Sequence, residues 1–258
     1  VATADGLMAR TLPPETLRSL AITLEVGGQA ELGALAEQLL SAGYTRCEQV
    51  EGVGQFALRG GILDVFSPLM DQPVRCEFFD DEIDSMGAFD PGTQRRTRNV
   101  SSARILPAAE VLPHCAPGGL LGLADQLTAL AEKLAKKQKT EAIVQTLRED
   151  AERLRSGAAP GAADRYLAAI YPTVTAGVHY LPPDAVVFLS ESGRVDERVK
   201  NTVLQQKQDV EALLSAGVLA GEYAHLTLTA EELYAALEDF PVILEDSLPT
   251  SRHPLRPR

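Results

Sequence analysis

The sequence lacks tryptophan altogether, and aromatic residues make up only 5% of its 258 residues. Hydrophobic residues still reach 45%, which is ordinary for a globular protein, so we expect a core built mainly from Leu, Val, Ile and Ala. No apolar run approaches the roughly 20 residues that a membrane-spanning helix needs, and the first residues do not follow the pattern of a signal peptide. These absences predict a protein with no membrane partner.

Basic residues and cysteines are also scarce. The chain has 24 Lys and Arg against 36 Asp and Glu, which gives a net charge of −12. Nucleic-acid binding draws much of its affinity from Lys and Arg that neutralise phosphates, so DNA is not expected to bind this chain directly. The cysteines are sparse, odd in number and widely spaced, which favours small apolar fillers in a cytoplasmic protein over a disulfide framework; they are Cys47, Cys76 and Cys115.

Signatures of nucleotide or metal chemistry are missing as well. The sequence contains no G-x-x-x-x-G-K-[ST] loop, no G-x-G-x-x-G after a strand, no C-x-x-C and no H-E-x-x-H. We therefore expect no cofactor, no metal and no small-molecule substrate. Two carboxylate hypotheses stay open, a hard cation at Asp80, Asp81 and Glu82, and acid–base catalysis by Asp64 with Glu77. Turn formation and solvation are the favoured roles for these acids.

The chain length suits one large or two modest domains. The opening stretch "VATADGLMARTLPPETL" has no initiator Met, and we expect the chain to be part of a longer protein. Residues 1–26 predict a short helix interrupted by Pro13-Pro14, followed by a strand. Residues 30–44 predict an amphipathic helix that ends at Gly43.

The rest of the chain predicts an α/β (α+β) fold. Short strands with apolar alternation are expected at 55–59, 61–66, 74–79, 82–89 and 102–106. With the preceding helix they predict a small sheet-plus-helix domain. A leucine stripe predicts a helical region over 119–156, with the lysines from 136 to 139 at a bend or on its solvent face. Beyond it, an α/β layer is predicted from strands at 185–190, 225–229 and 241–246 and helices at 193–216 and 230–239.

One strand, "VRCEFF", has two unlike faces, because side chains alternate along a strand. The face suited to a core consists of Val74, Cys76 and Phe78. The opposite face places an arginine, an acid and a large aromatic together, namely Arg75, Glu77 and Phe79. Arginine and aromatic side chains are enriched in the hot spots of protein interfaces.

The preceding strand, "QFALRG", adds Arg59 to the same face if the strands pair, and small Ala57 leaves room for a partner side chain. Two interpretations stay open. In the first, this is a binding face, which requires an exposed Phe79 ring and guanidinium groups that are not engaged within the chain. In the second, Phe79 packs under a loop and Arg59 pairs with Glu77.

The stretch "GQFALRGGILDVFSPLMDQPVRCEFFDDEIDSMGAFDPGTQRR" resembles the second domain of the bacterial transcription-repair coupling factor family, Mfd. A related stretch occurs in the excision-repair helicase UvrB. The resemblance is strong over residues 27–113 and continues through "ILPAAEVLP". Residues 114–258 lack the tyrosine-bearing segment with which UvrB returns to helicase sequence, which favours the coupling factor.

The resemblance implies three domains: residues 1–26 as the tail of a helicase-like subdomain, 27–108 as a UvrA-binding, UvrB-like domain, and 109–258 as a degenerate, nucleotide-free helicase-like domain. It also implies that UvrA is the partner and that Arg59, Arg75 and Phe79 bind it. The chain would be a non-catalytic adaptor in transcription-coupled nucleotide excision repair.

The family resemblance further implies that the parent protein is an ATP-dependent DNA translocase that displaces stalled RNA polymerase. ATP, Mg, DNA and RNA polymerase would then be bound by parts of the parent that lie outside this chain. The alternatives are part of a UvrB-type damage-verifying helicase or a carboxylate-based, metal-dependent enzyme.

Overall fold

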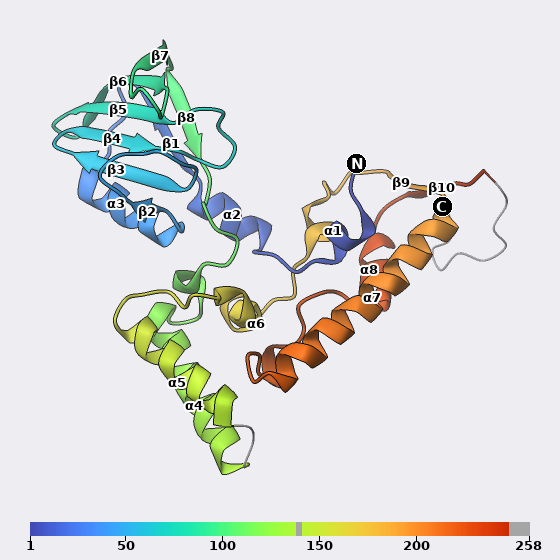
Figure 1. Cartoon of the computed structure of the whole chain (residues 1–258). Coiled ribbons are helices and arrows are strands. Elements are labelled where there is room, and N and C mark those ends of the chain that lie inside the picture. The colour runs from blue at the N-terminus through green and yellow to red at the C-terminus, as the bar shows by residue number, and fades with distance from the viewer. Residues whose placement is uncertain (138–140, 248–258) are drawn as a thin grey trace. The chain divides into compact units, whose positions relative to one another are not determined.

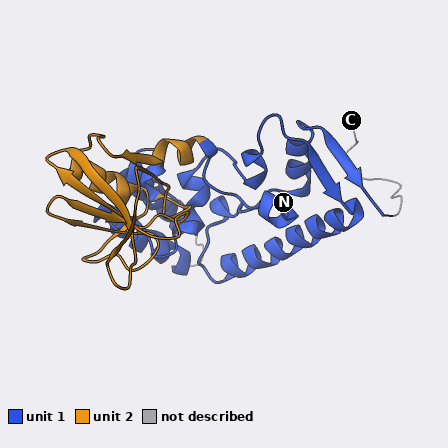
Figure 2. Ribbon diagram, turned by 90° about the horizontal axis from the view of Figure 1, so that it is seen from above, with its two compact units in different colours: residues 1–14, 113–258 blue, residues 15–112 orange. Residues whose placement is uncertain are grey.

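The computed structural model describes residues 1–137 and 141–247 and shows two compact units (Figure 2). We call residues 15–112 the sheet unit, and residues 1–14 together with the described residues from 113 onward the helical unit. The assignment of residues 1–26, 27–108 and 109–258 to helicase-like and UvrB-like domains stays a prediction. The predicted α/β fold class is confirmed, because both units combine helices with strands.

The sheet unit is built on a six-stranded sheet with the order β2-β3-β4-β5-β6-β7, which we call the main sheet (Figure 1). Only β2 and β3 are parallel, and every other neighbouring pair is antiparallel. The bounds are β2 Thr45–Arg46, β3 Gln55–Arg59, β4 Ile62–Val65, β5 Val74–Phe79, β6 Glu82–Phe89 and β7 Arg96–Asn99. The predictions missed β2 and β7, because β2 has only two residues and β7 is exposed throughout, so neither shows apolar alternation.

A second, two-stranded sheet and a helix complete the sheet unit. Strand β1 (Ile22–Glu25) pairs antiparallel with β8 (Ser102–Ile105), and α2 (Pro14–Leu20) and α3 (Leu32–Ser41) lie on either side of β1 in sequence. The core joins one face of the main sheet to α3 and to the β1–β8 pair. Its most deeply buried members include Leu24, Leu39, Phe56, Leu63, Cys76, Ile83, Met86 and Ile105.

The predicted end of α3 is confirmed in detail. Gly43 has φ 86°, a left-handed conformation that glycine adopts without steric cost. Its N–H donates to the carbonyl of Leu40 at 3.0 Å, and the N–H of Tyr44 donates to that of Leu39 at 3.0 Å. These two bonds are the Schellman motif, which satisfies the last carbonyls of the helix.

In the helical unit, the part of the chain from residue 113 onward contains a helical hairpin. Helices α4 (Gly119–Lys136) and α5 (Glu141–Arg155) pack side by side (Figure 1), so the predicted helical region over 119–156 is two helices. The leucine stripe lies in their interface, since Leu123, Leu127, Leu130 and Leu134 are buried. The predicted lysine bend falls partly outside the described residues, because α4 ends at Lys136 and the description resumes at residue 141.

The rest of the helical unit includes a small parallel strand pair, β9 (Val187–Ser190) and β10 (Val242–Glu245). Helices α1 (Ala4–Met8), α7 (Ser192–Ser215) and α8 (Ala230–Leu237) share its core. A short helix α6 spans Leu167–Ile170, and the 3-10 turns are Pro113–Cys115, Ala163–Tyr166, Gly177–Tyr180 and Gly221–Tyr223. These elements confirm the predicted helices near 193–216 and 230–239 and the strands near 185–190 and 241–246.

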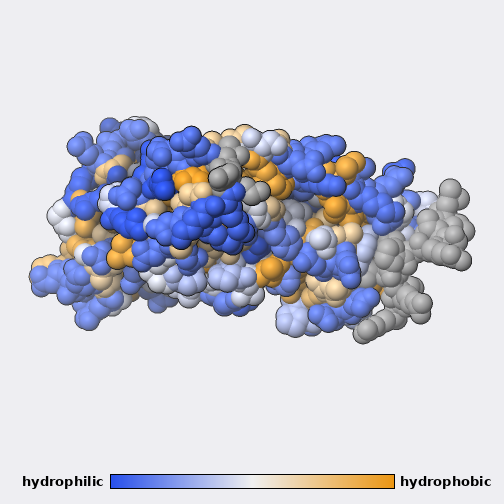
Figure 3. Space-filling view, turned by 90° about the horizontal axis from the view of Figure 1, so that it is seen from below, coloured by the Kyte–Doolittle hydropathy of each residue, from blue (hydrophilic) through white to orange (hydrophobic). Residues whose placement is uncertain are grey.

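The strand predicted at 225–229 is wrong. This segment makes an isolated bridge between Thr227 and Ala9, and backbone hydrogen bonds join it to Met8 and Arg10. Among the described residues it belongs to no strand, so the apolar alternation there reflects packing against the α1 segment and not a sheet. Within the described part of the chain, no helix has both the length and the apolar character to cross a membrane. The view in Figure 3 accordingly shows a mainly hydrophilic surface with scattered hydrophobic patches.

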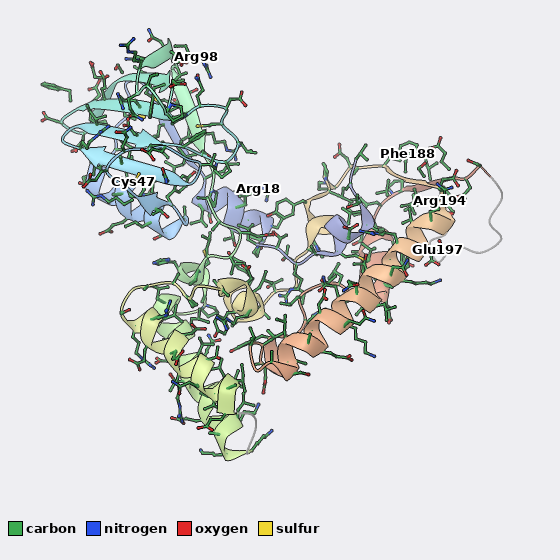
Figure 4. All side chains as sticks on the ribbon, in the orientation of Figure 1. Arg18, Cys47, Arg98, Phe188, Arg194 and Glu197 are labelled. Carbon is green, nitrogen blue, oxygen red and sulfur yellow. The ribbon has the colours of Figure 1, made fainter. Side chains whose placement is uncertain are left out.

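The buried thiol of Cys76 provides a direct probe of the sheet unit. Its side chain is 0% exposed, and burial raises its pKa to about 12. Cys47, which follows β2 (Figure 4), and Cys115 are partly exposed. In a Cys47→Ser/Cys115→Ser variant, we expect the remaining thiol to resist a disulfide reagent until the sheet unit unfolds, because the reactive species is the thiolate. Rapid labelling of this variant under native conditions would contradict the core described here.

Candidate partner-binding face

The main sheet has an outer face, which is the face turned away from α3, and the three predicted residues lie on it. Strand pairing aligns Asp64 of β4 with Arg75 of β5, and Ile62 of β4 with both Arg59 of β3 and Glu77 of β5. Facing residues of paired strands point to the same side of the sheet, and we call each such line of residues across the strands a row. Arg59 and Glu77 belong to one row, and Arg75 and Asp64 belong to the next row on the same face. Phe79 follows on the same face one row beyond Glu77. The predicted alternation along β5 is confirmed, because Val74, Cys76 and Phe78 pack into the core.

The Phe79 ring is open to solvent. Its side chain is 76% exposed, at the tip of the hairpin that joins β5 to β6. Asp80 follows with φ 51°, a left-handed conformation that Asp tolerates in tight turns. The alternative in which Phe79 packs under a loop is therefore wrong. An exposed phenylalanine at a strand end contributes little to the core and is available to another molecule.

The two guanidinium groups are engaged within the chain. Asp64 is 0% exposed and accepts from Nε and Nη2 of Arg75 at 2.6 and 2.8 Å, and from Nη2 of Arg59 at 2.8 Å. A carboxylate buried this deeply needs charged, hydrogen-bonded partners. The expectation of unengaged guanidinium groups is thus wrong, and so is the pairing of Arg59 with Glu77, because the buried acid one row away attracts both arginines.

Arg75 is the more firmly held of the two arginines. Nη2 also donates to Oε1 of Gln94 at 3.2 Å, and Cζ lies 4.6 Å from the centre of the Phe89 ring. The hydrogen bond to Asp64 raises the pKa of the Arg75 guanidinium above its ordinary value. Only 23% of the Arg75 side chain is exposed, against 49% for Arg59. Arg59 therefore offers more hydrogen-bonding surface to a partner, and Arg75 fixes the shape of the site.

Part of the outer face is covered by the protein itself. Ala57 is 1% exposed and packs in a second small core with Val50, Phe66 and Phe89. The expectation that Ala57 leaves room for a partner side chain is wrong, because the segment around Val50 fills that space. The open part of the face is consequently the end that carries Arg59, Glu77 and Phe79.

The carboxylates of the two open hypotheses take part in ion pairs, hydrogen bonds or the hairpin turn. Both oxygens of Asp64 accept from arginines, and Glu77 accepts from the hydroxyl of Ser85 at 2.9 Å. Asp80 and Asp81 form the turn of the β5–β6 hairpin. Among residues 1–137 and 141–247, no group of three or more His, Cys, Asp or Glu side chains is arranged to hold a metal ion.

Sequence reasoning missed one residue of this face, Arg96, which lies on the unpredicted strand β7. Its Nη1 lies 3.4 Å from the Ser85 hydroxyl and 3.9 Å from Oε1 of Glu77. The arginine-rich cluster "RRTR" could have indicated a basic residue near this face, but the pattern did not show which of its arginines lies on the outer face of the sheet.

Comparisons with known proteins find sequences similar to the sheet unit and to most of the chain. Residues 22–110 match the family model of the UvrB interaction domain. The chain is 30% identical over 211 residues to a transcription-repair-coupling factor of Bacillus subtilis (strain 168), which covers 81% of this chain and 18% of that protein. A factor of the same name from Myxococcus xanthus is 38% identical over 159 residues, covering 61% of this chain and 12% of that protein.

The transcription-repair-coupling factor of Staphylococcus aureus (strain USA300) is 27% identical over 248 residues, covering 92% of this chain and 20% of that protein. The chain thus spans a fifth or less of the length of these curated relatives. The matched UvrB interaction domain contains the whole outer face described above.

The Asp64 cluster predicts unequal effects of its two arginines on stability. Arg75→Ala leaves a fully buried carboxylate with one partner, and we expect the free energy of unfolding to fall by about 3 kcal/mol. Arg59→Ala removes a half-exposed partner, and a loss of about 1 kcal/mol is expected. Urea unfolding followed through protection of the Cys76 thiol measures both in the sheet unit. Equal losses, or none for Arg75→Ala, would show that Asp64 does not depend on Arg75.

Proposed function

Because the chain is a relative of the transcription-repair-coupling factors and carries a UvrB interaction domain, we propose that it docks UvrA through the outer face of its main sheet. Phe79 and Arg59 contact the partner, and Arg75 positions them. The chain then acts as an adaptor in transcription-coupled nucleotide excision repair. The observation that carries this proposal is the exposed Phe79 ring on the same face as two arginines that Asp64 holds in place.

The outer face is preorganised for binding. A phenylalanine that is already 76% exposed buries its ring on binding without leaving a core. Ordering a free arginine costs side-chain entropy, whereas Arg59 and Arg75 are already held by Asp64, so less is lost when the complex forms. Burying one aromatic ring against a partner contributes about 2 kcal/mol. The face therefore has the composition and rigidity of an interface hot spot.

The proposed roles of the arginines differ. The Asp64 carboxylate is the only hydrogen-bond partner of the Arg59 guanidinium within the described part of the chain, so its other nitrogens can donate to UvrA. All three nitrogens of Arg75 have partners in Asp64 or Gln94. Arg75 accordingly supports binding mainly through Asp64, which it shares with Arg59.

For the longer protein we propose the activity that the family resemblance implies, an ATP-dependent DNA translocase that displaces stalled RNA polymerase. This chain contributes recruitment and no catalysis. Two features support that division: the sequence has no phosphate-binding loop, and its net charge of −12 disfavours contact with nucleic acid. The names of the relatives favour this proposal over a UvrB-type helicase.

Removing the Phe79 ring tests the proposal. We expect Phe79→Ala to weaken binding of purified UvrA by about 30-fold, equivalent to a hot spot of 2 kcal/mol, and Arg59→Ala to weaken it less. Phe79→Ala does not touch the core, so its circular dichroism spectrum and thermal midpoint should match those of the parent chain. Arg59→Ala should keep the same spectrum while losing the roughly 1 kcal/mol of stability expected from the Asp64 cluster. Titration by surface plasmon resonance measures the dissociation constants.

Leu69→Ala is the matched control. Leu69 is 79% exposed, close to the value for Phe79, but it lies in the loop between β4 and β5, at the opposite end of β5. We expect wild-type affinity from this variant. Equal affinity of the Phe79→Ala variant and the parent chain would refute the proposal, as would an equal loss with Leu69→Ala.

A further inference from the structure

Arg96 reaches the outer face because of a β-bulge. Along β6 and β7, Phe89 pairs with Arg96 and Ala88 pairs with Arg98, so Thr97 is an extra residue between them. Adjacent residues of β6 point to opposite faces, and their partners do the same. Arg96 therefore lies on the outer face with Phe89, whereas Arg98, two positions away, lies on the other side. Bulges commonly re-aim a side chain in this way.

A glycine on the neighbouring strand lets the Arg96 side chain lie flat across the sheet. A Cβ added to Gly87 would stand 2.7 Å from Cζ of Arg96 and 2.8 Å from its Cδ. These distances are too short for non-bonded carbon atoms, so the side chain occupies the space that any other residue at position 87 would fill. Gly87 faces Arg75 across β5 and β6, which places the Arg96 chain next to the Asp64 cluster.

The guanidinium of Arg96 is anchored but remains accessible. Nη2 donates to the carbonyl of Met86, Nη1 lies 3.4 Å from the Ser85 hydroxyl, and Oε1 of Glu77 is 3.9 Å away. The side chain is still 37% exposed. Ser85 faces Glu77 in the row between those of Arg75 and Phe79. The Arg96 head group thus lies in the open part of the face.

We propose that Arg96 is a further UvrA-binding residue, positioned by Gly87, and that it receives a carboxylate of the partner. This inference rests on the proposed function and adds a residue that the family resemblance did not supply. Arg59, Arg75 and Arg96 come from β3, β5 and β7 and bring three guanidinium groups to one face of an acidic chain. The single negative charge of the buried Asp64 neutralises one of these three positive charges. A partner carboxylate at the edge of the Arg96 guanidinium that points away from Glu77 would find charged donors there.

The acids of the same face limit where that carboxylate can lie. Glu77 stands beside Arg96, and Glu82 faces Phe79 at the hairpin tip. Like charges repel, so the acidic group of the partner is directed to the outer edges of the arginines and away from the tip. The Phe79 ring then meets an apolar part of the partner. The occupant is consequently a protein surface with a carboxylate beside an apolar pocket.

Four variants test this assignment by titration with purified UvrA. We expect Arg96→Ala to weaken binding about tenfold and Arg96→Lys to recover part of the loss, because lysine keeps the charge but not the planar fork. Gly87→Ala should also weaken binding, since the new methyl group displaces a flexible side-chain end without moving the backbone. Arg98→Ala is the control on the same strand and should bind like the parent chain.

A double variant separates positioning from a loss of structure. If Gly87 acts through Arg96, Gly87→Ala/Arg96→Ala binds no more weakly than Arg96→Ala alone, with an unchanged thermal midpoint. Additive losses would overturn the positioning role. Wild-type affinity of Arg96→Ala, when Phe79→Ala has lost binding, would overturn the inference and leave the proposed function standing. No binding by the parent chain itself would overturn both.

Discussion

The sheet unit depends on one buried carboxylate. Asp64 lies on a central strand with no exposed surface, and burying its charge is unfavourable unless cationic partners compensate it. Arg59 and Arg75 supply that compensation from the flanking strands. Because both arginines are paired with Asp64, their long and flexible side chains are held in fixed positions on the surface. The ion pairs that offset the cost of burying the Asp64 charge also hold the arginines in positions suited to binding a partner.

The face also depends on irregularities in the ladder. A bulge opposite Glu77 and Phe78 adds a residue to β6, and a second bulge adds one to β7. A regular ladder would have put Arg96 and Arg98 on the same side, and the second bulge separates them. The local twist and re-aiming that bulges produce thus decide which of several neighbouring arginines lies beside Glu77 on the outer face.

Much of the fold was predictable where alternation or a helical stripe was strong. Strand β5, helix α3 with its Gly43 end, and the α4–α5 leucines followed their patterns. Strand β7 did not, because its four exposed residues carry no apolar signal. The strand expected at 225–229 failed for the opposite reason, since its alternation is real but within the described residues it makes only an isolated bridge. Periodicity reports which side of a segment is buried, and it does not report what covers that side.

The sequence alone determined that Arg75 and Phe79 share a face, because side-chain direction along a strand is set by its period of two. Arg59 lies on a different strand, and its place on that face depended on the pairing of β3, β4 and β5. The sequence also determined that Phe78 and Cys76 face inward. Only the tertiary structure decided that Asp64 would hold both arginines, that the second core would cover Ala57, and that Arg96 would join them across Gly87. Those outcomes depend on strand order, register and bulges, which arise from contacts between residues far apart in the chain.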